Sequence, residues 1–489
     1  MIGFLIFWPL VASLALFALR PQNAKVLAFV ASLVELVASL LAIVFIDHSG
    51  AVQLVITTPW IASLGIDFYV GIDGISLLLV LLTTTLVPLI ILSSYGQPVH
   101  QPHIFYGLIL FMQMALVGVF TARDGFLFYV FWEMALIPIY FICLIWGGAD
   151  RAWITLKFFI YTLAGSLFML VGLIYLYLHT PGVHTFNIHA LYQAGHSMSA
   201  PKQGLVFWMF FVAFAIKMPI FPFHTWQPDT YTVAPTQGTM LLSGIMLKMG
   251  IYGLIRWLIP VVPIGVASWA FTAIVLSVIG IVYASCLAII QVDFKRLIAY
   301  SSIAHVGLIS AGAMTLSKIG MQGAVIQMWS HGLIVFALFY IIDIITERTK
   351  TRTLSELGGI RQAAPLLTTV FMVVTLGSVA LPFTSGFVGE FLLINSLVKY
   401  KVIVGAMAGL TTILGAVYMF RTFQRTMLGE SNSLTQVFAD LTVREKVILY
   451  PVVALIVLIG VYPAPLLGLS ELAVNNVLTI ASQVTGPMK

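Results

Sequence analysis

The stretch Phe214-Ala-Ile-Lys217-Met-Pro219-Ile-Phe-Pro222 places a lysine and two prolines inside an apolar run. Proline has no backbone N–H and clashes with the preceding turn, so it interrupts a helix. Freed backbone groups and charges are costly in an apolar environment unless protein or water satisfies them. The pattern is typical of a broken membrane helix that carries an ionisable group for a functional reason.

The whole chain has the composition of a membrane protein. Of its 489 residues, 61% are hydrophobic and 8% are charged, whereas about 25% of residues are charged in a typical soluble domain. A soluble fold of this length could not cover so much apolar surface. We therefore expect lipid to surround most of the protein surface. We expect no nucleic-acid partner, because the basic residues are scattered between apolar runs.

Apolar runs of about 20 residues predict transmembrane helices. The first run lacks a basic n-region and an Ala-x-Ala-like cleavage site, so we interpret it as a retained span and not as a signal peptide. We predict an all-α polytopic membrane protein with about fourteen spans, which lie at 2–19, 26–46, 75–95, 104–121, 126–146, 155–178, 204–222, 237–259, 264–290, 297–316, 321–345, 365–395, 402–424 and 447–469.

Basic residues are divided unevenly between the two sets of alternate loops. Of the 23 Lys and Arg residues, the larger share falls in the set that begins with the Arg20/Lys25 loop. The positive-inside rule places that set in the cytoplasm. An even number of spans then places both termini outside, which means periplasmic in a bacterial inner membrane. That membrane is the default location, since no Arg-rich transit segment precedes the first span.

Several ionisable side chains fall within the predicted spans, where one charge costs about 2.5–3.5 kcal/mol. Each has a structural alternative: a lysine can snorkel to the headgroups, a histidine can bond between helices, and an acid can pair with a lysine. A buried ion pair is weak evidence for stability. Acids, lysines and histidines on separate helices together indicate a proton relay, and these residues are Glu133, Lys217, Lys248, His305, His331 and Glu390.

A second interrupted segment supports this interpretation. Glu390 follows Pro382 and lies close to Gly386 and Gly389. Two Pro/Gly-interrupted segments at separate positions, each with an ionisable residue, suggest the inverted repeats of transporters.

The sequence shows no motif for a cofactor or a metal. The two cysteines, Cys143 and Cys286, lie in apolar runs and form no Cys-x-x-Cys pair. They are too few to hold a cysteine-ligated iron–sulfur cluster. No Gly-x-Gly-x-x-Gly follows a strand, and there is no P-loop. We therefore expect no redox, nucleotide or metal site in this chain.

Three motifs resemble one family. They are the stretch from Lys217 to Asp229 together with Leu247-Lys-Met-Gly250, the stretch from Asp293 to Gly307, and His331-Gly-Leu. They resemble the antiporter-like subunits of respiratory complex I and of the related multisubunit sodium/proton antiporters. The family implies fourteen helices, with inverted repeats in helices 4–8 and 9–13 and with helices 7 and 12 broken. In this chain, residues 1–103 would contain helices 1–3, residues 104–259 the first repeat, residues 264–425 the second repeat, and residues 426–489 helix 14.

The resemblance also implies a role for each buried group. Relatives often have Leu-Pro-Asp-Ala-His where this chain has Gln227-Pro-Asp-Thr-Tyr231. The final histidine of the relatives' motif is thus absent here, whereas His224 and Asp229 are retained. We expect these two residues to be connectors or loop anchors. By resemblance, Glu133 and Lys217 are the coupling pair, and Lys248 is the central lysine. His305 and His331 are the central histidines, and Glu390 is the group at the exit half-channel.

Glu390 distinguishes between the family's subtypes. A glutamate in the broken twelfth helix is associated with the M-type subunit of complex I, whereas its siblings usually have a lysine there. The resemblance implies membrane partners of the L and N types, and places NADH, FMN, iron–sulfur clusters and quinone in partner subunits. This chain would then be the proton-translocating part of an enzyme, NADH:quinone oxidoreductase, with no redox site of its own.

Other functions remain open from the sequence. A subunit of a multisubunit sodium/proton antiporter, or of a membrane-bound hydrogenase, would carry out transport without NADH oxidation. If the chain were a passive membrane scaffold, replacing Lys217 or Glu390 would leave proton pumping unchanged and would impair only assembly of the complex. A quinone-binding subunit fits less well, because the ionisable groups lie in transport-like broken helices.

Overall fold

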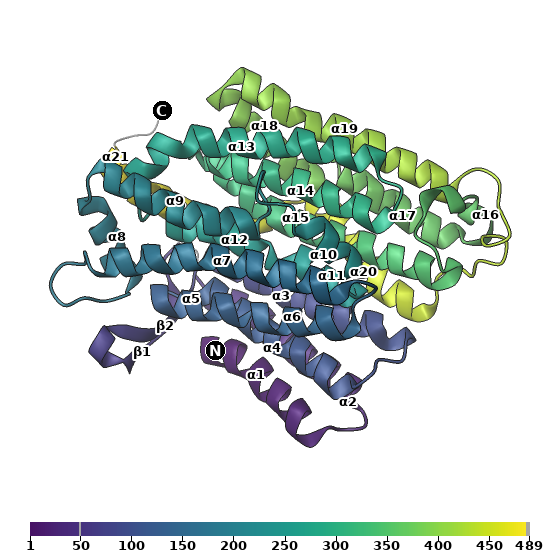
Figure 1. Ribbon diagram of the computed structural model, residues 1–489, viewed down its shortest axis with the longest axis horizontal. Helices are drawn as coiled ribbons and strands as arrows, with labels where there is room; N and C mark the ends of the chain where they lie inside the picture. Colours follow the sequence, from purple (N-terminus) through teal and green to yellow (C-terminus); the bar gives the residue numbers. More distant parts are fainter. Residues whose placement is uncertain (48–49, 486–489) are drawn as a thin grey trace.

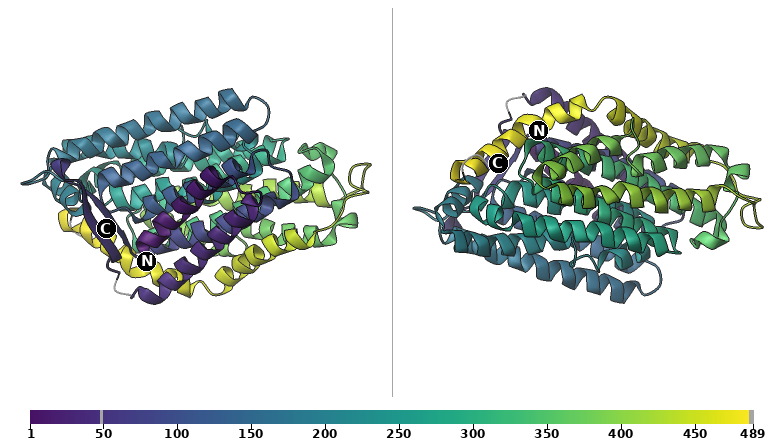
Figure 2. Two further views of the ribbon diagram at one scale, coloured as in Figure 1. Left: turned by 90° about the horizontal axis from the view of Figure 1, so that it is seen from below. Right: turned by 90° about the horizontal axis from the view of Figure 1, so that it is seen from above.

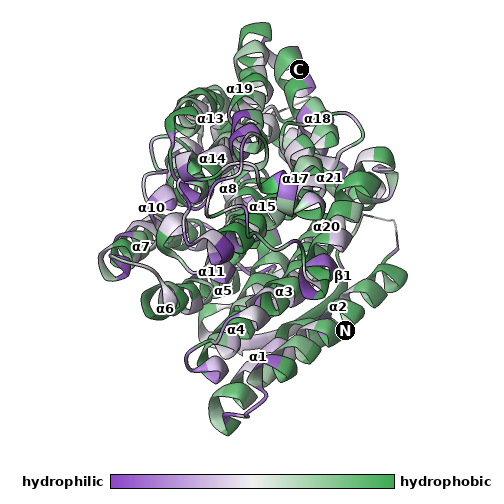
Figure 3. Ribbon diagram, turned by 90° about the vertical axis from the view of Figure 1, so that its right-hand side faces the viewer, coloured by the Kyte–Doolittle hydropathy of each residue, from purple (hydrophilic) through white to green (hydrophobic). Residues whose placement is uncertain are grey.

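The structure is a computed structural model, and it describes residues 1–47 and 50–485. Long helices lie side by side along one direction and form an elongated bundle (Figures 1 and 2). Seen from its end, the bundle consists mostly of hydrophobic helices (Figure 3). Within the described residues, 11 helices are long and apolar enough to cross a membrane. The prediction of a helical polytopic membrane protein is confirmed.

The N-terminal region combines four helices with one β-hairpin. The helices are α1 (Ile2–Leu19), α2 (Ala24–Phe45), α3 (Gly74–Ser93) and α4 (Pro102–Thr121). The antiparallel strands β1 (Gln53–Ile61) and β2 (Ile66–Ile72) pair Thr57 with Tyr69. The all-α prediction omitted this hairpin, because the segment between α2 and α3 contains no apolar run of spanning length.

The next region contains several interrupted helices. A turn at Ala135 divides the predicted fifth span in two, and two π-helical segments interrupt the predicted eighth span. The elements are α5 (Gly125–Met134), α6 (Leu136–Trp146), α7 (Arg151–Tyr177), α8 (Ile188–Ser197), α9 (Ala200–Lys217), α10 (Gln227–Val233), α11 (Thr236–Leu241), η3 (Leu242–Met246), α12 (Lys248–Gly253) and η4 (Leu254–Leu258).

The C-terminal part contains the second broken helix. Its elements are α13 (Pro263–Ile290), α14 (Phe294–Ala313), α15 (Lys318–Thr349), α16 (Ile360–Ala363), α17 (Pro365–Ser378), α18 (Ser385–Tyr400), α19 (Val402–Met427), α20 (Val443–Val461) and α21 (Ala464–Thr485).

Both predicted breaks are present. Helix α9 ends at Lys217, and the indole N–H of Trp226 donates to the Ile216 carbonyl at 2.9 Å across the turn that follows. Between α17 and α18 the chain passes through Pro382, with Ala380 and Phe383 at positive φ. Proline interrupts a helix, and a residue in the left-handed conformation cannot continue a right-handed one. The prolines in the sequence therefore predicted both interruptions correctly.

The predicted span at 447–469 is wrong as a single helix. The chain forms α20 and α21 instead, which follow one another along one edge of the bundle (Figure 2). Pro463 cannot donate a backbone hydrogen bond and disfavours a helical conformation at Tyr462, so the helix stops and restarts there. The total of fourteen spans, the region boundaries and the inverted-repeat relation stay predictions.

Helix α15 organises the centre of the bundle. Its 32 residues extend for about 48 Å, and it packs against α3, α14, α18, α20 and α21. The Trp329 indole N–H ties it to α3 by donating to the Leu78 carbonyl at 2.6 Å. Because α15 also carries His331, this packing fixes the position of that side chain.

Asp124 is the N-cap residue of α5, and its titration predicts that stability depends on pH. Its carboxylate accepts the backbone N–H groups of Phe126 and Leu127 at 2.9 and 3.0 Å. Burial raises the pKa of Asp124 to about 6, although these hydrogen bonds oppose the rise. In the unfolded chain an aspartate titrates near about 3.9. Between these values the folded protein binds more protons, so stability falls as pH rises through this window.

Asp124→Asn removes this titration and keeps a good helix cap. At pH 7 the variant is expected to be more stable by about 3 kcal/mol, the equivalent of about two pKa units. Thermal unfolding of the full chain between pH 4 and 7 checks this. The wild type should lose stability across the window relative to Asp124→Asn, and Asp150→Asn, at an exposed position, should behave like the wild type. Parallel pH profiles for wild type and Asp124→Asn would contradict the prediction.

Candidate proton-transfer site

Lys248 lies between the two π-helical segments and is fully buried. In η3 the Leu247 N–H donates to the Leu242 carbonyl at 3.1 Å. The Ser243 carbonyl, the usual α-helical acceptor for Leu247, is left free and accepts from Lys248 Nζ at 2.6 Å. Such π-bulges are frequent at functional sites. Sequence reasoning identified Lys248 but did not predict the backbone irregularity that holds it.

Lys248 reaches directly to the central helix α15. Its Nζ lies 3.0 Å from His331 Nδ1, and the other ring nitrogen, Nε2, lies 3.1 Å from Ser302 Oγ on α14. Gly244 and Gly332 allow this close approach, because a Cβ on Gly332 would lie 3.0 Å from the Gly244 carbonyl oxygen. One imidazole therefore bridges a lysine and a hydroxyl on two other helices.

The series of ionisable groups continues to α18. The rings of His331 and His305 have centroids 6.0 Å apart, and His305 Nδ1 lies 2.8 Å from Glu390 Oε1. Gln327 Nε2 and Thr412 Oγ1 also donate to the Glu390 carboxylate, at 3.4 and 3.2 Å. The structure thus brings Lys248, His331, His305 and Glu390, from four helices, into one buried cluster.

Glu133 on α5 and Lys217 at the end of α9 lie apart from this cluster. Lys217 Nζ lies 5.4 Å from the centre of the Trp132 ring, a cation–π geometry. Ser166 of α7 and the charge of Lys217 both lie within interaction range of the Glu133 carboxyl. In the described part of the chain no direct ion pair joins Glu133 to Lys217, and no hydrogen bond joins Lys217 to Lys248. Helices α9 and α12 nevertheless pack together.

The two expected connectors lie outside this series. The His224 ring packs between Phe221 and Tyr283, at 5.8 and 5.3 Å between ring centroids. Asp229 pairs with Lys157 of α7 at 3.0 Å and with Arg296 of α14 at 3.1 Å. These partly exposed pairs tie α10, which follows the first break, to two long helices.

Sequence reasoning missed two further acids. Glu35 on α2 is fully buried, and neither carboxylate oxygen has a hydrogen-bond partner among the described residues. Asp343 on α15 accepts from Thr236 Oγ1 at 2.5 Å. Both lie within predicted spans, so the rule that selected Glu133 and Glu390 could have found them.

A helical membrane fold with two broken helices and a buried series of acid, lysine and histidine defines an antiporter-like membrane subunit. Residues 122–415 match the family described as NADH:quinone oxidoreductase/Mrp antiporter, TM, and the chain belongs to this family.

Similar proteins agree with this assignment over the full length. NADH-quinone oxidoreductase subunit M of Rickettsia conorii is 38% identical over 483 residues, which cover 97% of each chain. F(420)H(2) dehydrogenase subunit M of Methanosarcina mazei is 38% identical and covers 99% of this chain and 98% of its own. A chain of respiratory complex I from Thermus thermophilus superimposes with a TM-score of 0.91 at 29% identity, over 99% of this chain and 100% of that chain.

Proposed function

We propose that this chain is the M-type proton-translocating membrane subunit of an NADH:quinone oxidoreductase. The observation that carries the proposal is the group of neighbouring buried ionisable side chains that extends from Lys248 through His331 and His305 to Glu390. Relatives named subunit M, similar over nearly the whole chain, support it. The chain would take part in the enzyme reaction without reacting with the electron donor itself.

The geometry around His331 suits proton transfer. A neutral imidazole has one donor and one acceptor nitrogen. His331 Nδ1 can accept a proton from Lys248 while Nε2–H releases one towards Ser302. In this proposal His305 is the next proton carrier, since its ring centroid lies 6.0 Å from that of His331, and Glu390 follows, with Oε1 2.8 Å from His305 Nδ1. Histidine suits this role because either ring nitrogen can donate or accept a proton.

Glu133 and Lys217 act as the control point in this proposal. The carboxylate and the ammonium lie within electrostatic range, so a change in the charge at Glu133 alters how strongly Lys217 holds its proton. In this proposal the proton passes from Lys217 to Lys248, whose helices α9 and α12 pack together. Moving one charge against the membrane potential costs about 2.3 kcal/mol per 100 mV. That energy arrives from the redox subunits through the neighbouring membrane subunit.

A polar cavity at the end of the bundle opposite the β-hairpin is the proposed proton entry. Its volume is about 520 Å³, and its lining includes Lys295, Asp343, Thr236 and Gln237. Thr236 begins α11, which runs into the π-helix next to Lys248. The loops rich in Lys and Arg lie at this end, so the positive-inside rule makes it the cytoplasmic side. Both termini are then periplasmic, in a bacterial inner membrane.

The proposed partners are neighbouring L-type and N-type membrane subunits. NADH, FMN, the iron–sulfur clusters and quinone bind to other subunits of the complex in this account. The F(420)H(2) dehydrogenase relative shows that the electron donor differs within the family. The choice of NADH therefore needs a direct test.

Inverted membrane vesicles containing the assembled complex provide this test. Addition of NADH should acidify the vesicle interior at the same rate with and without sodium, and a quinone-site inhibitor should stop both oxidation and acidification. Sodium-dependent transport that proceeds without NADH oxidation would overturn the proposal in favour of an antiporter subunit. Acidification with reduced F420 but not with NADH would overturn the choice of electron donor.

A further inference from the structure

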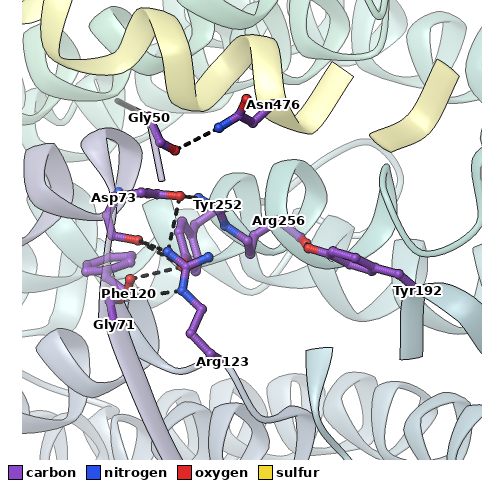
Figure 4. A network of polar contacts seen from close by, with 10 residues as sticks. Gly50, Gly71, Asp73, Phe120, Arg123, Tyr192, Tyr252, Arg256 and Asn476 are labelled. Carbon is purple, nitrogen blue, oxygen red and sulfur yellow. Dashed lines mark hydrogen bonds and ion pairs between the residues drawn. The ribbon is translucent and has the colours of Figure 1, made fainter. Parts of the chain in front are cut away.

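A second buried charged cluster lies beside the β-hairpin, away from the proposed relay. Asp73 is the N-cap residue of α3, and its Oδ1 accepts the Ser76 N–H at 3.0 Å. Its other oxygen, Oδ2, lies 3.1 Å from Arg123 Nη2 and also pairs with Arg256 Nη2 (Figure 4). The side chains come from three separate parts of the chain, so the fold, and not local sequence, assembles the cluster.

The cluster carries more positive than negative charge. Burial alone would raise the pKa of Asp73, but Arg256 and Arg123 outweigh this effect and hold it well below its usual range. Asp73 is therefore ionised, and one carboxylate faces two guanidinium groups. Arg256 Nε is buried and has no hydrogen-bond partner among the described residues. An uncompensated buried charge is costly, so this arrangement calls for an anion.

A cavity of about 270 Å³ adjoins these groups. One water needs only about 10–15 Å³ of such space. Asp73, Arg123 and Arg256 line the cavity, together with His189 and Asn476, and Asp73 is the one acid among its described lining residues. Burial and the charge of Arg123 both lower the pKa of His189, which agrees with a positive potential in this space.

The position of the cavity limits what can enter it. Asp73 directly precedes a candidate span, Arg123 follows one, and Arg256 lies two residues before the end of another. The guanidinium groups therefore lie at one end of the bundle, where spanning helices meet lipid headgroups. The apolar residues Val477 and Ile480 of α21 form another part of the lining. A polar wall beside an apolar wall fits an anionic group at a membrane surface.

We propose that this cavity binds a phosphate group, whose oxygens accept hydrogen bonds from Arg123 and Arg256. The planar fork of arginine donors matches phosphate oxygens in a bidentate geometry. The phosphate can belong to a lipid headgroup or to inorganic phosphate, since both present the same oxygens. The inference does not rest on proton transport by this chain.

Thermal unfolding of the full-length chain in detergent, titrated with inorganic phosphate at constant ionic strength, tests the inorganic source. Phosphate should raise the midpoint for the wild type, whereas chloride should not. Arg256→Gln should weaken the apparent affinity about tenfold, the effect of losing one charge-assisted hydrogen bond. Asp73→Asn keeps the helix cap and removes the competing carboxylate, so it should strengthen the affinity.

A second readout tests the lipid source. The chain, purified in the presence of phosphatidylglycerol and washed in detergent, is assayed for bound lipid by native mass spectrometry. Ile480→Trp fills the cavity without changing the charged groups and should abolish either kind of binding. Lipid retained by the wild type but lost in Ile480→Trp identifies a headgroup, and stabilisation by phosphate without retained lipid identifies the free ion. The proposal would be overturned if the wild type showed neither stabilisation by phosphate nor retained lipid. It would also be overturned if these effects were equal in wild type, Asp73→Asn and Ile480→Trp.

Discussion

Glu390→Gln is expected to lower NADH-driven proton transport and NADH oxidation together, by about tenfold or more, because a positioned proton-transfer group typically contributes at least that much. Glutamine keeps the size of the side chain and can still bond to Gln327 and Thr412. It cannot take a proton from His305, which lies 2.8 Å from the native carboxylate. Oxidation falls with transport because the two processes are coupled.

Initial rates of acidification and of NADH oxidation in inverted vesicles check this prediction, after the amount of assembled complex has been measured. Glu471→Gln is a suitable control, since Glu471 lies at the surface in a pair with Lys318. The control should keep wild-type rates. Full coupled transport by assembled Glu390→Gln complex would show that protons do not leave through this carboxyl group.

Lys217→Ala is the second substitution with a large expected effect. It removes the cation that interacts with Glu133 and the Trp132 ring. Transport and oxidation should both fall by about tenfold or more, for the reason given for Glu390. The substitution also removes the buried lysine stem from the packing around it, so the amount of assembled complex must be measured in parallel.

Two further variants separate transport from assembly at this position. Lys202→Ala lies on the same helix at an exposed position and should keep both rates. Lys217→Arg keeps the charge but does not readily give up its proton, so it should assemble normally and transport slowly. Normal transport per assembled complex in Lys217→Ala would favour the passive scaffold.

The breaks in the helices and the buried cluster could be predicted from the sequence because each has a local cause. Prolines after Lys217 and before Glu390 mark the interruptions. A charged residue within an apolar run is conspicuous on any hydropathy scale. The family resemblance then indicated which of these residues act together, and the structure places Lys248, His331, His305 and Glu390 next to one another.

The remaining features depend on contacts between distant segments. The π-helical segments around Lys248 follow from tertiary packing, and the sequence Leu242 to Met246 has no mark that distinguishes it from an α-helix. The cluster of Asp73, Arg123 and Arg256 joins residues at span ends, where charges are common and attract no notice. The hairpin between α2 and α3 contains no apolar run of spanning length, so a criterion based on helix length does not predict it.

The central claim is that Lys217 and Glu390 belong to one proton path, and a double-mutant cycle tests it most directly. Lys217→Arg and Glu390→Asp are expected to slow transport only in part. In a series of steps the slowest one sets the rate, so the double variant should transport at nearly the rate of the slower single variant. Losses that multiply in the double variant, at equal amounts of assembled complex, would show that the two residues act independently and would contradict the single relay.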